Sequence, residues 1–234
     1  MAINPNNSLP LKHACYCGAS GAGKTTAVKL LKKVGAQAVL FDPMGDYTPS
    51  RVRKLSGLGN GRTVHHYTSR AGFLAAFSDA WRTKKTFAIA YTPKAEQGEA
   101  LRAEALWFGD LVWKASDGKR ELHAVFEEVP RYSNNPVADK SILGAIASAG
   151  RKYGIVAHWV FQRPTQIPKT FINDASEYIV GAQQSMKDAK RWAEELDCDL
   201  AAIVELGRLN KPREKHYLHK KEGIGNFEKV VLRF

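Results

Sequence analysis

Two kinds of apolar segment alternate along this chain. Short apolar runs bounded by turn residues, such as 38–41 and 122–126, predict strands that are buried on both faces of a sheet. Segments such as 24–34 carry apolar residues at helical spacing and predict helices between those strands. This alternation indicates an α/β fold, in which helices cover both faces of a mostly parallel sheet. Such sheets bind ligands at the carboxyl ends of their strands, where functional motifs should therefore meet.

The same patterns place the individual elements. We expect strands at 12–17, 38–41, 86–91, 122–126, 155–161 and 177–180. We expect helices at 24–34, 73–81, 96–115, 140–149 and 186–196, the first of them capped by Gly35. Two late segments, 216–218 and 230–234, predict an antiparallel hairpin at the edge of the sheet.

The 234 residues predict a single domain. Residues 1–10 are polar and lack the profile of a signal peptide, so we expect a flexible tail before a domain at 11–234. No linker, repeat or low-complexity tract divides that domain. No apolar run approaches the roughly 20 residues that a membrane-spanning helix needs.

A phosphate-binding motif follows the first expected strand. The pattern G-x-x-x-x-G-K-[ST] is matched in full by Gly18, Ala19, Ser20, Gly21, Ala22, Gly23, Lys24 and Thr25. The glycines allow a tight turn whose backbone N–H groups point at phosphate oxygens. Lys24 would neutralise the β- and γ-phosphates of ATP, Thr25 would bind Mg²⁺, and Thr26 completes the binding segment. A chance glycine-rich turn is the alternative, but the strand before the motif and the helix after it argue against one.

Two adjacent acids end another apolar strand. A nucleotide-hydrolysing site needs a carboxylate at a strand end beside the phosphate loop. Glu127 and Glu128 follow the apolar run 122–126. We assign Glu127 to the water shell of Mg²⁺ and Glu128 to the general base that prepares the attacking water. A solvated strand terminus is the alternative interpretation of this pair.

Four further residues are candidates for the site. Asp42 could orient Lys24 or a metal-bound water, although Asp-Pro-x-Gly is also ordinary turn chemistry. Gln162, at the end of the strand at 155–161, is placed to hydrogen-bond the γ-phosphate or the attacking water. Arg151 and Arg163 are candidates for an arginine supplied to a neighbouring subunit, and Arg151 is the better one because it lies in a turn.

The charge of the chain suggests a polyanionic partner. Lys and Arg outnumber Asp and Glu by 35 to 23, which gives a net charge of +12. This excess suits nucleic acid or an acidic membrane surface, although a merely basic, soluble surface is an alternative. The basic residues are scattered along the sequence, so they favour a folded positive groove or pore over a disordered basic arm.

The motifs together resemble those of a known family. The phosphate loop is followed by an Asp-Pro-x-Gly-acid-aromatic turn at 42–47, two acids at 127–128, Gly-Arg at 150–151 and Gln-Arg-Pro at 162–164, with Ile-Pro at 167–168. This order resembles the HerA/FtsK superfamily of DNA-pumping ATPases and implies a RecA/HerA-like P-loop fold. Glu127 departs from the Asp that the family usually has there.

The size of the chain indicates which members of this superfamily it resembles. Cellular members carry membrane helices or accessory domains, whereas small members are similar to genome-packaging ATPases of membrane-containing icosahedral viruses such as tectiviruses. That resemblance implies a homo-oligomeric ring, expected to be a hexamer, that moves double-stranded DNA into a preformed capsid. It also implies portal or packaging-vertex partners, viral membrane proteins as neighbours, and a location in the host cytoplasm and the virion.

Three other functions are compatible with the sequence. One is a plasmid-transfer or filamentous-phage export ATPase, which would need a membrane anchor or an export partner. A small-molecule kinase would leave the positive charge and the Gln-Arg-Pro run unexplained. A nucleotide-gated binding module without appreciable turnover would leave Glu128 without a role.

Overall fold

A nine-stranded sheet forms the centre of the computed structural model, which describes residues 5–50, 52–59, 61–134, 137–221 and 223–234. The strand order among these residues is β3-β4-β2-β5-β6-β1-β7-β8-β9. All pairings from β3 to β7 are parallel, and β7-β8 and β8-β9 are antiparallel. The strands are β1 Ala14–Cys17, β2 Gln37–Phe41, β3 His65–Tyr67, β4 Phe87–Tyr91, β5 Leu122–Phe126, β6 Ile155–Phe161, β7 Glu177–Val180, β8 Glu214–Lys220 and β9 Phe227–Arg233.

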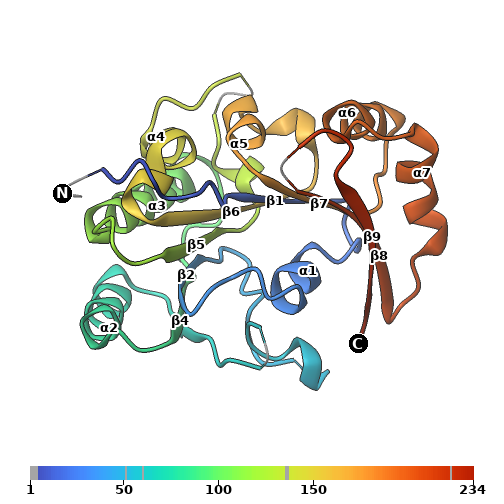
Figure 1. Ribbon diagram of the computed structural model, residues 1–234. Coiled ribbons are helices and arrows are strands. Elements are labelled where there is room, and N and C mark those ends of the chain that lie inside the picture. The colour runs from blue at the N-terminus through green and yellow to red at the C-terminus, as the bar shows by residue number, and fades with distance from the viewer. Residues whose placement is uncertain (1–4, 51, 60, 135–136, 222) are drawn as a thin grey trace.

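Helices cover both faces of this sheet (Figure 1). The helices are α1 Lys24–Leu30, α2 Arg70–Thr83, α3 Gly98–Ala115, α4 Ile142–Ala149, α5 Lys169–Asn173, α6 Met186–Leu196 and α7 Leu200–Leu209. One hydrophobic cluster joins the sheet to α2 through α7, and a second cluster joins the opposite face to α1 and to apolar residues of 47–64. The expected α/β fold, with its mostly parallel sheet and its C-terminal antiparallel hairpin, is therefore confirmed.

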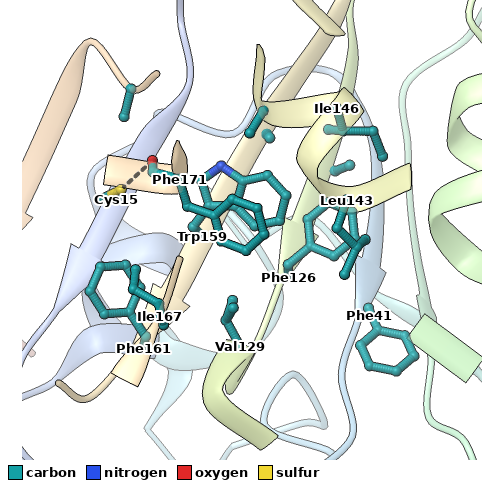
Figure 2. Close-up of a cluster of buried hydrophobic side chains, with 14 of the residues drawn as sticks. Cys15, Phe41, Phe126, Val129, Leu143, Ile146, Trp159, Phe161, Ile167 and Phe171 are labelled. Atoms are coloured by element: carbon teal, nitrogen blue, oxygen red, sulfur yellow. Dashed lines mark hydrogen bonds between the residues drawn. The ribbon is translucent and has the colours of Figure 1, made fainter. Parts of the chain in front are cut away.

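The two central strands are fixed by stacked aromatic rings. Phe126 of β5 stacks on Trp159 of β6 with their ring centroids 4.6 Å apart, and Trp159 stacks on Phe171 of α5 at 4.2 Å. Figure 2 shows these rings side by side, with the Cys15 thiol directed at the Phe171 carbonyl oxygen, to which it donates at 3.3 Å. Fully buried aromatic pairs of this kind hold neighbouring strands in one register. The carboxyl ends of β5 and β6 are thus held side by side.

Helix α1 differs from the sequence-based prediction. We expected it to reach residue 34 and to be capped by Gly35, but it ends at Leu30 with Leu31 as its cap. Gly35 has a different role, because a Cβ atom at this position would overlap the ring of His123 on β5. The glycine lets the chain pass closely over the buried histidine, which no local pattern reveals.

The pattern also missed one strand and two helices. It did not predict the three-residue β3, the five-residue α5 or the helix α7. Elements of three to five residues are too short for a periodicity to become visible. No helix in the described ranges is long and apolar enough to cross a membrane.

The C-terminal hairpin packs against the phosphate loop. Both of its strands are seven residues long, which is longer than the segments at 216–218 and 230–234 that we expected. The Tyr217 hydroxyl of β8 donates to the carbonyl oxygen of Gly23 at 2.9 Å. The hairpin therefore closes the edge of the sheet and also supports the turn between β1 and α1 (Figure 1).

Candidate nucleotide-binding and hydrolysis site

The phosphate loop connects the end of β1 to the start of α1. Gly21 and Gly23 have φ angles of 76° and 89°, in the left-handed region that glycine adopts at little cost. A Cβ atom on Gly23 would lie 2.5 Å from the Tyr217 hydroxyl oxygen, so the turn also needs glycine for space. Lys24 is buried at the first position of α1, and Thr25 and Thr26 are half-buried. This arrangement leaves a glycine-rich turn with a lysine at its end, as a phosphate cradle requires.

Glu127 is completely buried at the end of β5. Its Oε1 accepts a hydrogen bond of 2.6 Å from the Tyr47 hydroxyl, whereas its Oε2 has no partner among the described residues. Burial is the main cause that raises the pKa of Glu127 to about 8. The hydrogen bond from Tyr47 opposes this shift, and the charges of Asp46, Asp42 and Glu128 add to it. A cation beside the unpartnered oxygen would favour the ionised carboxylate.

The residues at this point fit a magnesium ion. An unpartnered buried carboxylate oxygen is the donor that Mg²⁺ prefers, and Mg²⁺ in nucleotide sites uses one or two protein oxygens together with phosphates. Thr25 is the second residue of α1, and this helix packs on the same face of the sheet as Tyr47, the hydrogen-bond partner of Glu127. No group of three or more His, Cys, Asp or Glu residues in the described ranges could form a metal cage of its own. The fit therefore depends on bound phosphates.

Asp42 stabilises the turn that contains Tyr47. Its two carboxylate oxygens accept hydrogen bonds from the backbone N–H groups of Asp46 at 2.9 Å and Tyr47 at 3.2 Å. Both oxygens are used inside the turn, which favours the turn chemistry over direct orientation of Lys24. Asp42 thus acts through Tyr47, which the sequence showed only as the aromatic position of the 42–47 motif.

Glu128 turns away from Glu127 and faces a cavity. Its φ of 52° is unusual for a residue other than glycine, and such strain is often retained at functional sites. Gln162, at the end of β6, donates from Nε2 to both carboxylate oxygens of Glu128 at 3.3 Å. Both side chains line a cavity of about 440 Å³. Because β6 lies between β5 and β1, Gln162 comes between the acid pair and the phosphate loop.

The two candidate arginines lie at opposite ends of β6. Arg163 follows Gln162, and its Nε donates to Asp188 of α6 at 2.9 Å. Ala19 of the phosphate loop lines the same small cavity of about 270 Å³ as Arg163. Arg163 is therefore at the edge of the sheet where nucleotide would bind.

Arg151 lies in the short 3₁₀ helix Gly150–Tyr153 rather than in the expected turn, at the amino end of β6 and thus at the opposite ends of the strands from its own phosphate loop. Its Nη1 donates to the carbonyl oxygens of Asn7 at 3.2 Å and Leu9 at 2.7 Å. The Asn6 N–H also donates to the Lys152 carbonyl oxygen at 2.6 Å. Residues 5–10 form no helix or strand, and residues 1–4 of the expected tail lie outside the described residues. Any role of Arg151 in a neighbouring subunit stays a prediction.

Comparison with known proteins finds a relative of this chain in a phage. It is 25% identical over 228 residues to protein P9 of Pseudoalteromonas phage PM2. The aligned region covers 97% of this chain and 93% of the phage protein. The chain is a homologue of this phage protein. No protein-family model matches it.

Solved structures show the same fold. The genome packaging NTPase B204 of Sulfolobus turreted icosahedral virus 2, in complex with ATP-gammaS, aligns with a TM-score of 0.58 at 14% identity over 95% of this chain and 97% of B204. The DNA-packaging ATPase B204 of Sulfolobus turreted icosahedral virus aligns at 0.53 and 12% identity, over 99% of this chain and 98% of that one. The chain thus has the P-loop fold of these two viral proteins along almost its whole length.

The contact between Tyr47 and Glu127 predicts a specific phenotype. Tyr47→Phe removes the hydrogen bond that Oε1 of Glu127 accepts, so ATP hydrolysis should need roughly three- to tenfold more Mg²⁺ to reach half of its maximal rate. A magnesium titration of the initial rate measures this shift. Tyr132→Phe is the matched control, because the Tyr132 hydroxyl is buried without a partner among the described residues. An unchanged magnesium requirement in Tyr47→Phe would mean that Tyr47 does not position a metal-binding carboxylate.

Proposed function

We propose that this protein is an ATP-hydrolysing motor that packages viral double-stranded DNA into a preformed capsid. The observation that carries the proposal is the convergence of the phosphate loop, the acids at 127–128 and Gln162 at three adjacent strand ends of one sheet. The fold shared with B204, described as a DNA-packaging ATPase, and the homology to a phage protein support it. The net charge of +12 suits a DNA partner.

The proposed chemistry follows from the positions of the side chains. The backbone N–H groups of 18–25 and the Lys24 ammonium hold the phosphates of ATP. Mg²⁺, held by Thr25 and Glu127 together with the phosphates, would neutralise charge on the β- and γ-phosphoryl groups. Glu128 accepts the proton of the water that attacks the γ-phosphorus, and the bond to the β–γ bridging oxygen breaks to give ADP and phosphate. Gln162 holds the Glu128 carboxylate in place and orients that water.

We further propose that the motor works as a homo-oligomeric ring, expected to be a hexamer. Residues 5–10 lie against Arg151 at the edge of the sheet away from the phosphate loop. An arginine there would have to reach a neighbouring subunit to contact its γ-phosphate. Mixing wild-type and Arg151→Ala subunits should then reduce hydrolysis more than in proportion to the mutant fraction. A strictly proportional loss would exclude Arg151, and the same mixture with Arg163→Ala would test the other candidate.

Hydrolysis measured with and without DNA tests the proposal. We expect duplex DNA to raise the steady-state rate of ATP hydrolysis, and the active fraction to elute as a particle several times the mass of one chain. The stimulation should fall steeply as salt rises, because contacts between cationic side chains and phosphates release counterions. Full activity in a monomeric fraction without any response to duplex DNA would contradict the motor and favour a small-molecule kinase.

A further inference from the structure

A basic groove lies between α5 and α6, on the opposite face of the sheet from α1. The two helices lie beside each other above the sheet in Figure 1. The groove encloses about 570 Å³. Its basic lining consists of Lys169 from α5 and Lys187, Lys190 and Arg191 from α6, with Glu194 and Glu195 toward the end of α6.

The lysines of this groove are free to bind an anion. Lys169, Lys187 and Lys190 are exposed, and none of them forms an ion pair with another described residue. Elsewhere on the surface many cations are paired, as Lys33 is with Glu177 at 2.8 Å and Lys229 with Glu205 at 3.1 Å. A binding surface for a polyanion needs cations that no internal carboxylate already neutralises.

The spacing of the cations suits a row of phosphates. Lys187, Lys190 and Arg191 are three and four residues apart, so they share one side of α6, with neighbouring Cβ atoms about 5–6 Å apart. Lys169 adds a positive charge from the facing helix α5. Arg191 is only loosely paired, at 3.8 Å from Glu195. Such a cluster recognises the backbone of nucleic acid without reading its bases.

The inner side of α6 connects the groove to the hydrolysis site. Asp188 is buried, and its two carboxylate oxygens accept hydrogen bonds from Arg163 at 2.9 Å and from Thr165 at 3.2 Å. Arg163 directly follows Gln162, which contacts Glu128. Thr165 lines both the cavity at Glu128 and the basic groove. Helix α6, which carries three of the four basic residues, is thus hydrogen-bonded through the Asp188 carboxylate to the segment that follows Gln162.

We propose that the α5–α6 groove binds the sugar-phosphate backbone of duplex DNA, and that Asp188 links this contact to Gln162. The proposal rests on the proposed DNA motor and adds to it the surface through which the motor binds duplex DNA. If DNA bound in the groove moved α6, Arg163 and Thr165 would move together, because both donate hydrogen bonds to Asp188. Asp188 is a positioning residue in this arrangement.

A salt-dependence experiment with a matched control tests the groove. The groove variant carries Lys169→Gln, Lys187→Gln and Lys190→Gln. The control variant carries Lys85→Gln, Lys114→Gln and Lys119→Gln, three exposed lysines without ion pairs among the described residues, next to the amino ends of β4 and β5 or at the end of α3. Both variants lose the same charge. Binding of a short labelled duplex is followed by fluorescence anisotropy from low to high salt.

The groove variant should lose about 0.9 unit of slope in log Kobs against log[salt] for each phosphate contact removed, or about 2.7 units for three. The control variant should keep the wild-type slope, and restoring charge with arginine at the three groove positions should restore it. Equal slopes in wild type and groove variant, with DNA bound by both, would overturn the groove while leaving the motor intact. Absence of duplex binding by the wild type at low salt would overturn both.

Discussion

Replacing Glu128 with glutamine is expected to slow ATP hydrolysis by about 10²–10⁴-fold while ATP stays bound. The amide has nearly the same shape as the carboxylate and can still contact Gln162, which lies 3.3 Å from both carboxylate oxygens in the wild type. It cannot accept the proton of the attacking water. Single-turnover hydrolysis and ATP affinity, measured on the same preparation, separate the two effects.

Two further variants define the specificity of this effect. Glu96→Gln removes an exposed carboxylate from a residue whose backbone carbonyl oxygen accepts a hydrogen bond from Arg131 in the lining of the cavity at Glu128, and it should leave hydrolysis at the wild-type rate. Glu127→Gln should alter the magnesium requirement first, because Glu127 is buried beside Tyr47 and faces away from Gln162. Hydrolysis by Glu128→Gln within a few fold of wild type would remove Glu128 from the role of general base.

Replacing Lys24 with alanine is expected to weaken ATP binding by about 10²–10⁴-fold, because charge-assisted contacts to two phosphates are lost. Lys24 is buried at the start of α1. Lys29, the other lysine of this helix, cannot take its place because it donates to the Asp46 carbonyl oxygen at 2.6 Å. Isothermal titration calorimetry with a non-hydrolysable ATP analogue measures the change. Lys85→Ala removes an exposed lysine from the opposite edge of the sheet and serves as the control. Unchanged affinity in Lys24→Ala would show that the loop at 18–25 is not the phosphate site.

Much of the candidate site could be predicted because its residues directly follow the carboxyl ends of strands. Parallel strands bring their carboxyl ends to one edge, so a phosphate loop after β1, two acids after β5 and a glutamine after β6 had to come close together. Strands β5, β6 and β7 begin and end at the expected residues because their apolar runs are bounded by polar or turn residues. Local pattern and sheet geometry were sufficient for these parts.

The parts that could not be predicted depend on tertiary contacts. The hydrogen bond from Tyr47 to Glu127 joins residues 80 positions apart, and that from Tyr217 to Gly23 joins residues 194 apart. The left-handed backbone at Glu128, which sends adjacent acids to different sides, has no signature in two consecutive glutamates. Arg151 seemed near Gln162 in sequence, but the seven residues of β6 carry the two to opposite edges of the sheet.

The most direct test of the central claim is whether the protein moves along duplex DNA when it hydrolyses ATP. A labelled third strand bound to a duplex reports such movement, since a motor that travels along the duplex displaces it. We predict displacement by the wild type that requires both ATP and Mg²⁺, and no displacement by Glu128→Gln, which should still bind ATP and DNA. Robust ATP hydrolysis by a DNA-bound oligomer that never displaces the third strand would contradict a DNA-translocating motor.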